Sequence, residues 1–190
     1  MIQGAKVTLR PLGEKDLETI CRWDSEYYVA AVPESGDGRH LDTRKDYEKI
    51  LHSRTARMFA IEAGDGSLIG DIGLVEISWR RGEAELVVRI GDDRYRGRSY
   101  GQDAIACLLE YVFGHTKLCR VYLRVFEENV PAVRCFEKCG FRKEWAMIRK
   151  PEGGGHARKV ILMALERKDF LKTARCHAAA DVAHLFGSAV

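Results

Sequence analysis

The 190-residue sequence lacks the features that mark membrane-spanning and secreted proteins. No apolar run reaches the roughly 18 residues that a membrane-spanning helix needs. The first residues, Met1 to Lys6, do not form the apolar stretch of a secretory signal. From these two absences we expect a soluble cytoplasmic protein.

The six cysteines lack the spacing of a metal site or of a disulfide framework. The sequence has no C-x-x-C motif, and no pair of histidines is placed to complete a zinc site. Cys107, Cys135 and Cys139 fall at apolar positions of helix-like stretches. We therefore expect buried free thiols and no metal.

The chain also lacks a strong charge of one sign, internal repeats and an obvious linker. Its net charge is +3, and Lys and Arg are spread along it, which argues against nucleic acid as a partner. Apolar residues make up 46% and charged residues 31%, as in a globular domain with one core. We expect one domain over residues 1–167 and an alanine-rich tail, residues 168–190, of unassigned structure.

The hydrophobic pattern predicts an α/β (α+β) domain whose central sheet is mixed and mostly antiparallel. Seven strands are expected, at 6–10, 58–63, 68–78, 83–90, 120–126, 141–149 and 158–166. About four helices are expected, at 17–23, 43–53, 102–113 and 131–140. Asp16 is the expected cap of the first helix and Gly114 the expected stop of the third. The two strand-to-helix crossings, after Ile90 and Phe126, predict strands that are locally parallel.

A strand, a glycine-bearing turn and a helix start follow one another around the run from Arg96 to Gly101. The first N–H groups of a helix have no partner within it, and the helix dipole adds partial positive charge there. Glycines let the backbone approach a ligand closely, and arginines add positive charge. The arrangement predicts a phosphate cradle, with a solvated Arg/Gly loop as the alternative.

Two segments resemble signatures of the GNAT N-acetyltransferase superfamily. The run from Ile90 to Gly101 resembles its acetyl-CoA pyrophosphate loop, Gln/Arg-x-x-Gly-x-Gly/Ala. Downstream, Asn129 to Phe141 resembles Asn-x-x-Ala-x-x-x-Tyr-Glu-Lys-x-Gly-Phe. The opening, Leu9 to Trp23, is similar to the branch that contains ribosomal-protein N-acetyltransferases, with diamine and aminoglycoside acetyltransferases nearby. The resemblance implies the GNAT fold and acetyl-CoA as cosubstrate.

The resemblance also assigns residues to acetyl-CoA. The main chain of Val88 and Ile90 would hold the pantetheine arm, and Asn129 would hold the pantetheine or thioester region, with helix capping as the alternative. Lys138 would reach the 3′-phosphate, unless it is a solvated helix lysine. The pyrophosphate would be bound by the main chain of Arg96, Gly97, Arg98, Ser99, Tyr100 and Gly101.

Transfer of acetyl to an amine requires a group that takes the amine's proton. The resemblance points to Glu85, with Glu83 on the same strand face as the fallback. The alternative for Glu85 is a solvated carboxylate or one paired with a neighbouring arginine. The backbone N–H of Val88 would stabilise the oxyanion, and the non-catalytic alternative for Val88 is ordinary core packing.

The chain departs from the family pattern at two positions. Ser99 replaces the penultimate glycine of the loop, which is a poorer fit if the backbone there needs a positive φ. Phe136 replaces the tyrosine that protonates the CoA thiolate in many members, so that proton would come from water or from the incoming amine.

The acceptor is expected to enter opposite the cofactor, past Trp23, Tyr27, Tyr28 and the loop 33–40. Acidic residues there, Glu26, Glu34 and Asp37, would attract a cation. We expect a protein or peptide N-terminal amine as the acceptor. The alternatives are a small amine, such as an aminoglycoside, polyamine or amino acid, and a non-catalytic acyl-CoA-binding regulator. A homodimer through the late strands is a candidate assembly.

Overall fold

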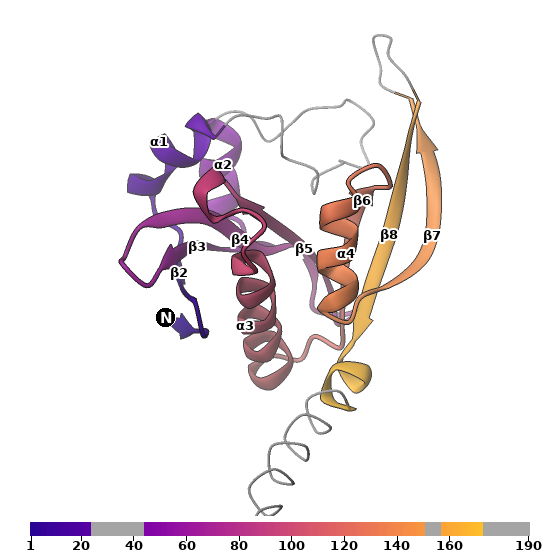
Figure 1. Ribbon diagram of the computed structural model, residues 1–190. Helices are drawn as coiled ribbons and strands as arrows, with labels where there is room; N and C mark the ends of the chain where they lie inside the picture. Colours follow the sequence, from indigo (N-terminus) through magenta and orange to yellow (C-terminus); the bar gives the residue numbers. More distant parts are fainter. Residues whose placement is uncertain (24–43, 151–156, 173–190) are drawn as a thin grey trace, which may run out of the picture.

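The computed structural model describes residues 1–23, 44–150 and 157–172. One sheet of eight strands forms the centre, in the order β1-β2-β3-β4-β5-β6-β8-β7 (Figure 1). The strands are β1 (Ile2–Gln3), β2 (Val7–Pro11), β3 (Arg57–Ala63), β4 (Leu68–Ser78), β5 (Glu83–Ile90), β6 (Arg120–Phe126), β7 (Arg142–Arg149) and β8 (Arg158–Glu166). The helices are α1 (Glu14–Arg22), α2 (Arg44–Leu51), α3 (Tyr100–His115) and α4 (Val130–Lys138).

The alternation of side chains along β5 shows how the two sheet faces differ. Ala84 and Leu86 belong to the larger core, which includes the apolar faces of α3 and α4. Val87 points the other way and packs in a smaller core with residues of α1 and α2. Glu83 and Glu85 share the face of Val87 because successive strand residues point to opposite faces. We call these the α3/α4 face and the acidic face.

Strands β5 and β6 are joined only over part of their length. Their parallel pairing runs from Glu83↔Arg120 to Glu85↔Tyr122, and no further pair between these fully described strands follows. Beyond it β5 continues to Ile90, while β6 keeps its antiparallel pairing with β8 as far as Phe126↔Val160. The two strands therefore separate after Glu85, which leaves a gap in the sheet between β5 and β6.

The fold confirms the predicted order of elements and corrects several details. The sheet has an eighth strand, β1, which is only two residues long and pairs with β2. The crossing after Ile90 joins β5 to its parallel neighbour β6, and the one after Phe126 joins β6 to β7, which runs in the same direction. There β8 lies between β6 and β7 and is antiparallel to both, so β6 and β7 are not neighbours.

Two predicted helix boundaries also differ. Gly13, not Asp16, is the N-cap of α1, and the Asp16 carboxylate accepts a 2.9 Å hydrogen bond from the Gly13 N–H. Gly114 lies inside α3, which ends one residue later and is closed by Thr116. The apolar face of α3 extends to Phe113, which is buried, so packing carries the helix past the glycine.

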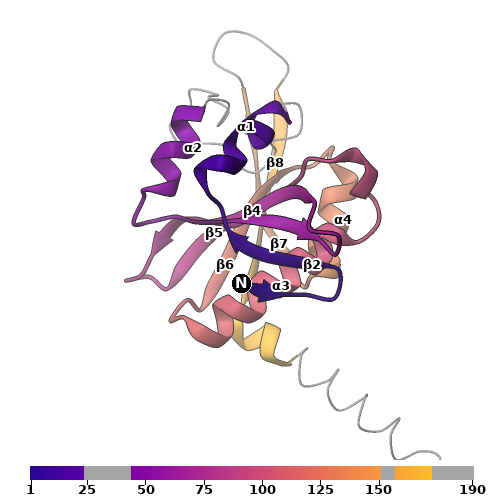
Figure 2. The ribbon, with the colours of Figure 1, turned by 90° about the vertical axis from the view of Figure 1, so that its left-hand side faces the viewer.

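Figure 2 shows β1 and β2 close to α3. The Asp103 carboxylate of α3 accepts hydrogen bonds from the backbone N–H groups of Lys6, at 2.7 Å, and Val7, at 3.0 Å. No helix within the described parts of the chain is long and apolar enough to cross a membrane. Residues 167–172 are helical, and the rest of the tail lies outside the described residues.

Candidate active site

A cavity of about 450 Å³ lies between the end of β5, the start of α3 and the exposed side of α4. Its lining includes most of the predicted cofactor residues: Val88, Ile90, Arg96, Gly97, Ser99, Tyr100, Gly101 and Asn129. Arg98 is predicted with them but is not among the lining residues. Additional lining comes from Tyr95, Gln102, Arg134, Cys135 and Lys138. The structure therefore brings together residues that the sequence separates by about 50 positions.

The turn before α3 has a backbone shape that favours glycine. Gly97 has a φ of 69°, and Ser99, the N-cap of α3, has a φ of 67°. The positive φ considered for Ser99 is thus present, and its side chain makes no capping hydrogen bond. Consecutive turns of this kind direct backbone N–H groups into a concave surface suited to an anion. A cradle with this geometry fits the pyrophosphate of CoA.

Arg96 braces this turn rather than extending into solvent. Its Nε donates to the Ile90 carbonyl at 2.8 Å, and Nη2 donates to the Gly91 carbonyl at 3.1 Å. A third contact pairs it with Asp93. From the other side, Lys6 donates through Nζ to the Arg98 carbonyl at 3.0 Å. These contacts hold the cradle against the end of β5.

The register of β5 directs the main chain of Val88 and Ile90 toward the gap. Gly91 N donates to the Ile69 carbonyl, and 69 and 91 continue the register Gly70↔Ile90. Hydrogen-bonded and non-hydrogen-bonded pairs alternate in an antiparallel ladder. Val88 and Ile90 therefore occupy the non-hydrogen-bonded positions facing β4, and their N–H groups point to the opposite edge. This geometry supports the predicted roles of Val88 and Ile90.

Helix α4 forms the opposite wall of the cavity. Asn129 caps this helix, because its Oδ1 accepts a 3.2 Å hydrogen bond from the Ala132 N–H. The capping alternative is therefore present, together with its position on the cavity. Phe136 is buried in the core and packs edge-on against Phe141, with ring centroids 6.0 Å apart. Lys138 is exposed and lines the cavity.

On the acidic face, the carboxylate of Glu85 is paired with Arg124. The Arg124 Nε donates to Oε1 of Glu85 at 2.8 Å, and Nη2 donates to Oε2. The Glu85 side chain is 1% exposed and that of Arg124 is 8% exposed. This pairing with an arginine was the alternative considered for Glu85 from the sequence. Its role as the proton acceptor stays a prediction.

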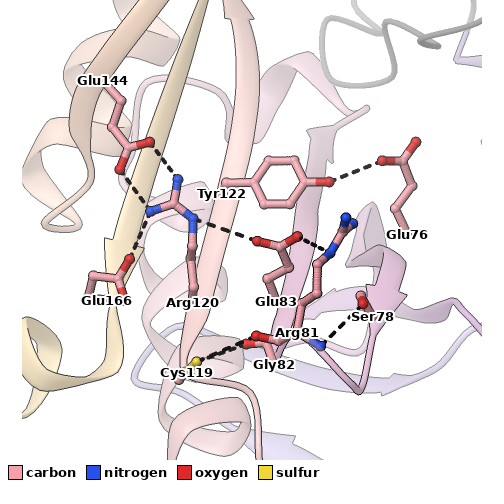
Figure 3. A network of polar contacts seen from close by, with 10 residues as sticks. All are labelled: Glu76, Ser78, Arg81, Gly82, Glu83, Cys119, Arg120, Tyr122, Glu144 and Glu166. Atoms are coloured by element: carbon pink, nitrogen blue, oxygen red, sulfur yellow. Dashed lines mark hydrogen bonds and ion pairs between the residues drawn. The ribbon is translucent and has the colours of Figure 1, made fainter.

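Glu76 lies beside this pair on β4. It has a φ of 50°, in a stretch where the register between β4 and β5 shifts. Such bulges redirect a side chain. Its carboxylate accepts a 3.0 Å hydrogen bond from Tyr122 and lies 3.5 Å from Nη2 of Arg124 (Figure 3 shows the contact with Tyr122). Burial, then the Glu76 carboxylate, raise the pKa of Tyr122 above its ordinary value of 10.0.

A second guanidinium joins the strands further along this face. Nη1 of Arg120 donates to both Glu144 and Glu166 at 2.8 Å, and Glu83 pairs with Arg81 at 2.7 Å (Figure 3). Glu83, the fallback base, is therefore also paired. The hydrogen bond from Arg120 holds the pKa of Glu144 below its ordinary value.

A buried polar network closes the other end of the acidic face, under α1 and α2. Arg89 donates to Asp71 at 2.9 Å, to the Tyr47 hydroxyl at 2.8 Å and to the Trp23 carbonyl at 2.8 Å. Burial raises the pKa of Asp71, against the opposing effect of Arg89. A Cβ on Gly91 would lie 2.0 Å from the Trp23 ring, so this position needs glycine. The network holds the backbone of Trp23, which is one of the predicted acceptor residues.

The polar residues of β6 were not among the predicted site residues. Its alternating pattern places Arg120, Tyr122 and Arg124 on one face, a signal visible in the sequence. Their partners on β4, β5, β7 and β8 could not be seen without the sheet order. The other predicted acceptor residues, Glu26, Tyr27, Tyr28, Glu34, Asp37 and the loop 33–40, lie outside the described residues. Within the described part of the chain, no group of three His, Cys, Asp or Glu side chains is placed to hold a metal ion.

A family model described as an acetyltransferase (GNAT) domain matches residues 6–142. The chain belongs to the GNAT acetyltransferase family. The fold and the activity class predicted from its two signatures are thus confirmed, and the chain is an acetyl-CoA-dependent N-acetyltransferase.

Among the proteins that are similar to this chain are bacterial spermidine acetyltransferases. The spermidine N(1)-acetyltransferase of Vibrio cholerae is 28% identical over 173 residues, covering 88% of this chain and 97% of the relative. The Escherichia coli K12 enzyme of the same name is 28% identical over 172 residues, covering 90% and 91%. A crystal structure of the V. cholerae enzyme with CoA and spermine has a TM-score of 0.70 and 26% identity, covering 87% and 98%. These relatives do not support the expected ribosomal-protein branch.

Proposed function

We propose that this acetyltransferase acts on a polyamine of the spermidine class, by direct attack of a primary amine on acetyl-CoA in a ternary complex. The relatives named above support this choice over a protein N-terminus, which was the main expectation from the sequence. The single structural observation that carries the proposal is the separation of β5 from β6 after Glu85: beyond it Val88 and Ile90 line the cofactor cavity, while Glu85 itself lies on the acidic face.

The acidic face offers carboxylates that can meet the ammonium groups of a polyamine. The contacts around Glu85 and Arg120 join five carboxylates to three guanidiniums. These are Glu76, Glu83, Glu85, Glu144 and Glu166 with Arg81, Arg120 and Arg124. A polyamine carries several ammonium groups on flexible apolar spacers, so carboxylates spread over four strands can each meet a charge.

Glu76 is the carboxylate best placed to meet the reacting end of the acceptor. Its side chain is 47% exposed, whereas that of Glu85 is 1% exposed. Both contact Nη2 of Arg124, so Glu76 lies at the mouth of the gap. The reacting ammonium must lose a proton before it attacks the thioester. Glu85 remains the predicted acceptor of that proton, and Phe136 leaves the CoA thiolate to be protonated by water or by the amine.

The test is CoA release from acetyl-CoA with spermidine, spermine, an aminoglycoside and peptides with a free N-terminus. We expect kcat/KM for spermidine to exceed that for the peptides, and its KM to rise with salt because the charge contacts are partly exposed. Glu76→Gln should raise the spermidine KM about three- to tenfold, the size of one such contact. Glu18→Gln on α1, whose side chain is 81% exposed, is the matched control. Turnover restricted to peptides would contradict the proposal.

A further inference from the structure

Two cysteines lie four residues apart on the wall of the cofactor cavity. Cys135 is in the last turn of α4, and Cys139 is the residue that ends it. Residues four apart share one side of a helix. Cys135 lines the cofactor cavity, and Cys139 lines a smaller hollow of about 370 Å³. The two hollows share Ser99, Gln102 and Lys138, so the two thiols lie along one continuous surface between α3 and α4.

The side chains of Cys135 and Cys139 shift each other's acidity. The neighbouring Cys139 thiol lowers the pKa of Cys135 from its ordinary value of 9.0, and Lys138 acts in the same direction. The Cys135 thiol, and then burial, raise the pKa of Cys139. This division is typical of dithiols in which one sulfur reacts first and the other resolves the product.

The remaining described thiols have other surroundings. Burial raises the pKa of Cys21, and it raises that of Cys107, which is in the core, to about 11. Cys119 is exposed, is not among the residues that line the cavity, and donates its S–H to the Gly82 carbonyl at 3.3 Å. A reaction that depends on the cavity should therefore select Cys135.

We propose that Cys135 is a site of covalent modification by small anionic disulfides, with Cys139 as the resolving thiol. Arg134 and Lys138 line the cavity beside Cys135 and would attract an anionic disulfide, such as coenzyme A disulfide or glutathione disulfide. The inference rests on the four-residue spacing of the two thiols and on their places along the two hollows, and its effect on activity rests on the larger cavity being the acetyl-CoA site.

The reaction balances in two exchange steps. The Cys135 thiolate attacks one sulfur of the disulfide, which forms a mixed disulfide and releases one small-molecule thiolate. The Cys139 thiolate then attacks the Cys135 sulfur, which forms the Cys135–Cys139 disulfide and releases the second thiolate. Both protein thiol protons end on the released thiols. Four residues of helix rise about 6 Å, within the roughly 4.4–6.8 Å between Cα atoms that a disulfide spans. Their Cβ atoms, about 5–6 Å apart on a regular helix, must approach to about 3.5–4.5 Å, which requires the end of α4 to move.

Modification should prevent cofactor binding. A mixed disulfide places the added group inside the cavity. The internal disulfide would draw the end of α4 inward and change the wall that Lys138 shares with the cradle. Oxidised protein should therefore bind acetyl-CoA at least about tenfold more weakly, and a thiol reductant should restore binding.

The experiment treats the full chain with coenzyme A disulfide, glutathione disulfide or neutral 2-hydroxyethyl disulfide, followed by tryptic peptide mapping. Trypsin cuts after Arg134, Lys138 and Arg142, so Cys135 and Cys139 fall in adjacent peptides. We expect these two peptides to become linked in the wild type. In Cys139→Ser the mixed disulfide should remain on the peptide 135–138, and the anionic reagents should react faster than the neutral one.

The comparison thiol is Cys119, which should react without regard to reagent charge. Bound CoA should protect Cys135 but not Cys119. Unlinked peptides in the wild type, or a Cys135 that reacts no faster than Cys119 and without protection, would overturn the proposal. Acetyl-CoA binding is measured on the reduced protein in parallel. If the reduced protein did not bind acetyl-CoA, the assignment of the cavity as the acetyl-CoA site would be wrong. The linkage of the two cysteine peptides is measured separately and does not depend on that binding.

Discussion

Arg124 and Glu85 form a buried ion pair across β5 and β6, with Nε and Oε1 2.8 Å apart, although 39 residues separate them in the sequence. Glu85 also belongs to the last pair of residues, with Tyr122, before the two strands part. The ion pair therefore lies at the closed end of the gap between β5 and β6. Its strength bears on both stability and chemistry.

Glu85→Gln should lower the free energy of unfolding by up to about 3–5 kcal/mol, because it leaves the buried Arg124 charge with only the Glu76 carboxylate, 3.5 Å away, as its counter-charge. Urea unfolding followed by circular dichroism measures this loss. The double variant Glu85→Gln/Arg124→Gln removes both charges and should recover most of the stability. Equal losses in the single and double variants would contradict the ion-pair explanation.

The same double variant tests the catalytic role of Glu85 without the cost of an unpaired charge. If Glu85 accepts the amine's proton, kcat should fall by about a hundredfold or more while acetyl-CoA binding is retained. A kcat close to that of the wild type would assign the proton to another group, and Glu76 would then be the next residue to replace.

Ser99→Gly should stabilise the protein by about 1 kcal/mol, because a φ of 67° strains any side chain. Thermal unfolding of the free protein checks this. Ser99→Ala is the control, since it removes the hydroxyl but keeps the strain. If alanine stabilised as much as glycine, backbone conformation would not be the cause.

Arg96→Ala should weaken acetyl-CoA binding about tenfold, because the side chain holds the cradle to the Ile90 and Gly91 carbonyls. Calorimetric titration with CoA measures the effect. Arg98→Ala is the matched control, since Arg98 is not among the residues that line the cavity and should change binding less than about threefold. A larger effect at Arg98 than at Arg96 would contradict this assignment.

Asp16→Asn should destabilise the protein at neutral pH and have little effect in acid. Burial favours the protonated form of Asp16, but hydrogen bonds from Arg10 and Gly13 outweigh it and hold its pKa below the ordinary value of 3.8. Because the folded pKa is the lower one, the stabilisation is present above pH 3.8 and is lost as pH falls through the folded value. Unfolding of both proteins between pH 7 and pH 2 measures it. A difference independent of pH would contradict this linkage.

The fold could be predicted largely because its signals are local. Alternation predicted β6 with its observed bounds, Arg120–Phe126, and the glycine turn located the start of α3 to within two residues. Predictions failed where packing overrode local preference. Gly114 was expected to end α3, but the helix continues through it because its apolar face is buried. The insertion of β8 between β6 and β7 could likewise not be predicted from local signals.

The residues of the candidate site likewise fall into those that could be predicted from the sequence and those that could not. The turn from Arg96 to Gly101 could be predicted from the sequence, since a turn followed by a helix start is a local arrangement that its own residues specify. The folded chain was needed to show that Arg124 pairs with Glu85, that Tyr122 donates to Glu76, and that α4 faces the cradle across one cavity. Those contacts depend on which strands are neighbours and where β5 and β6 part. Strand order is set by the packing of the whole sheet, which no single stretch of sequence contains.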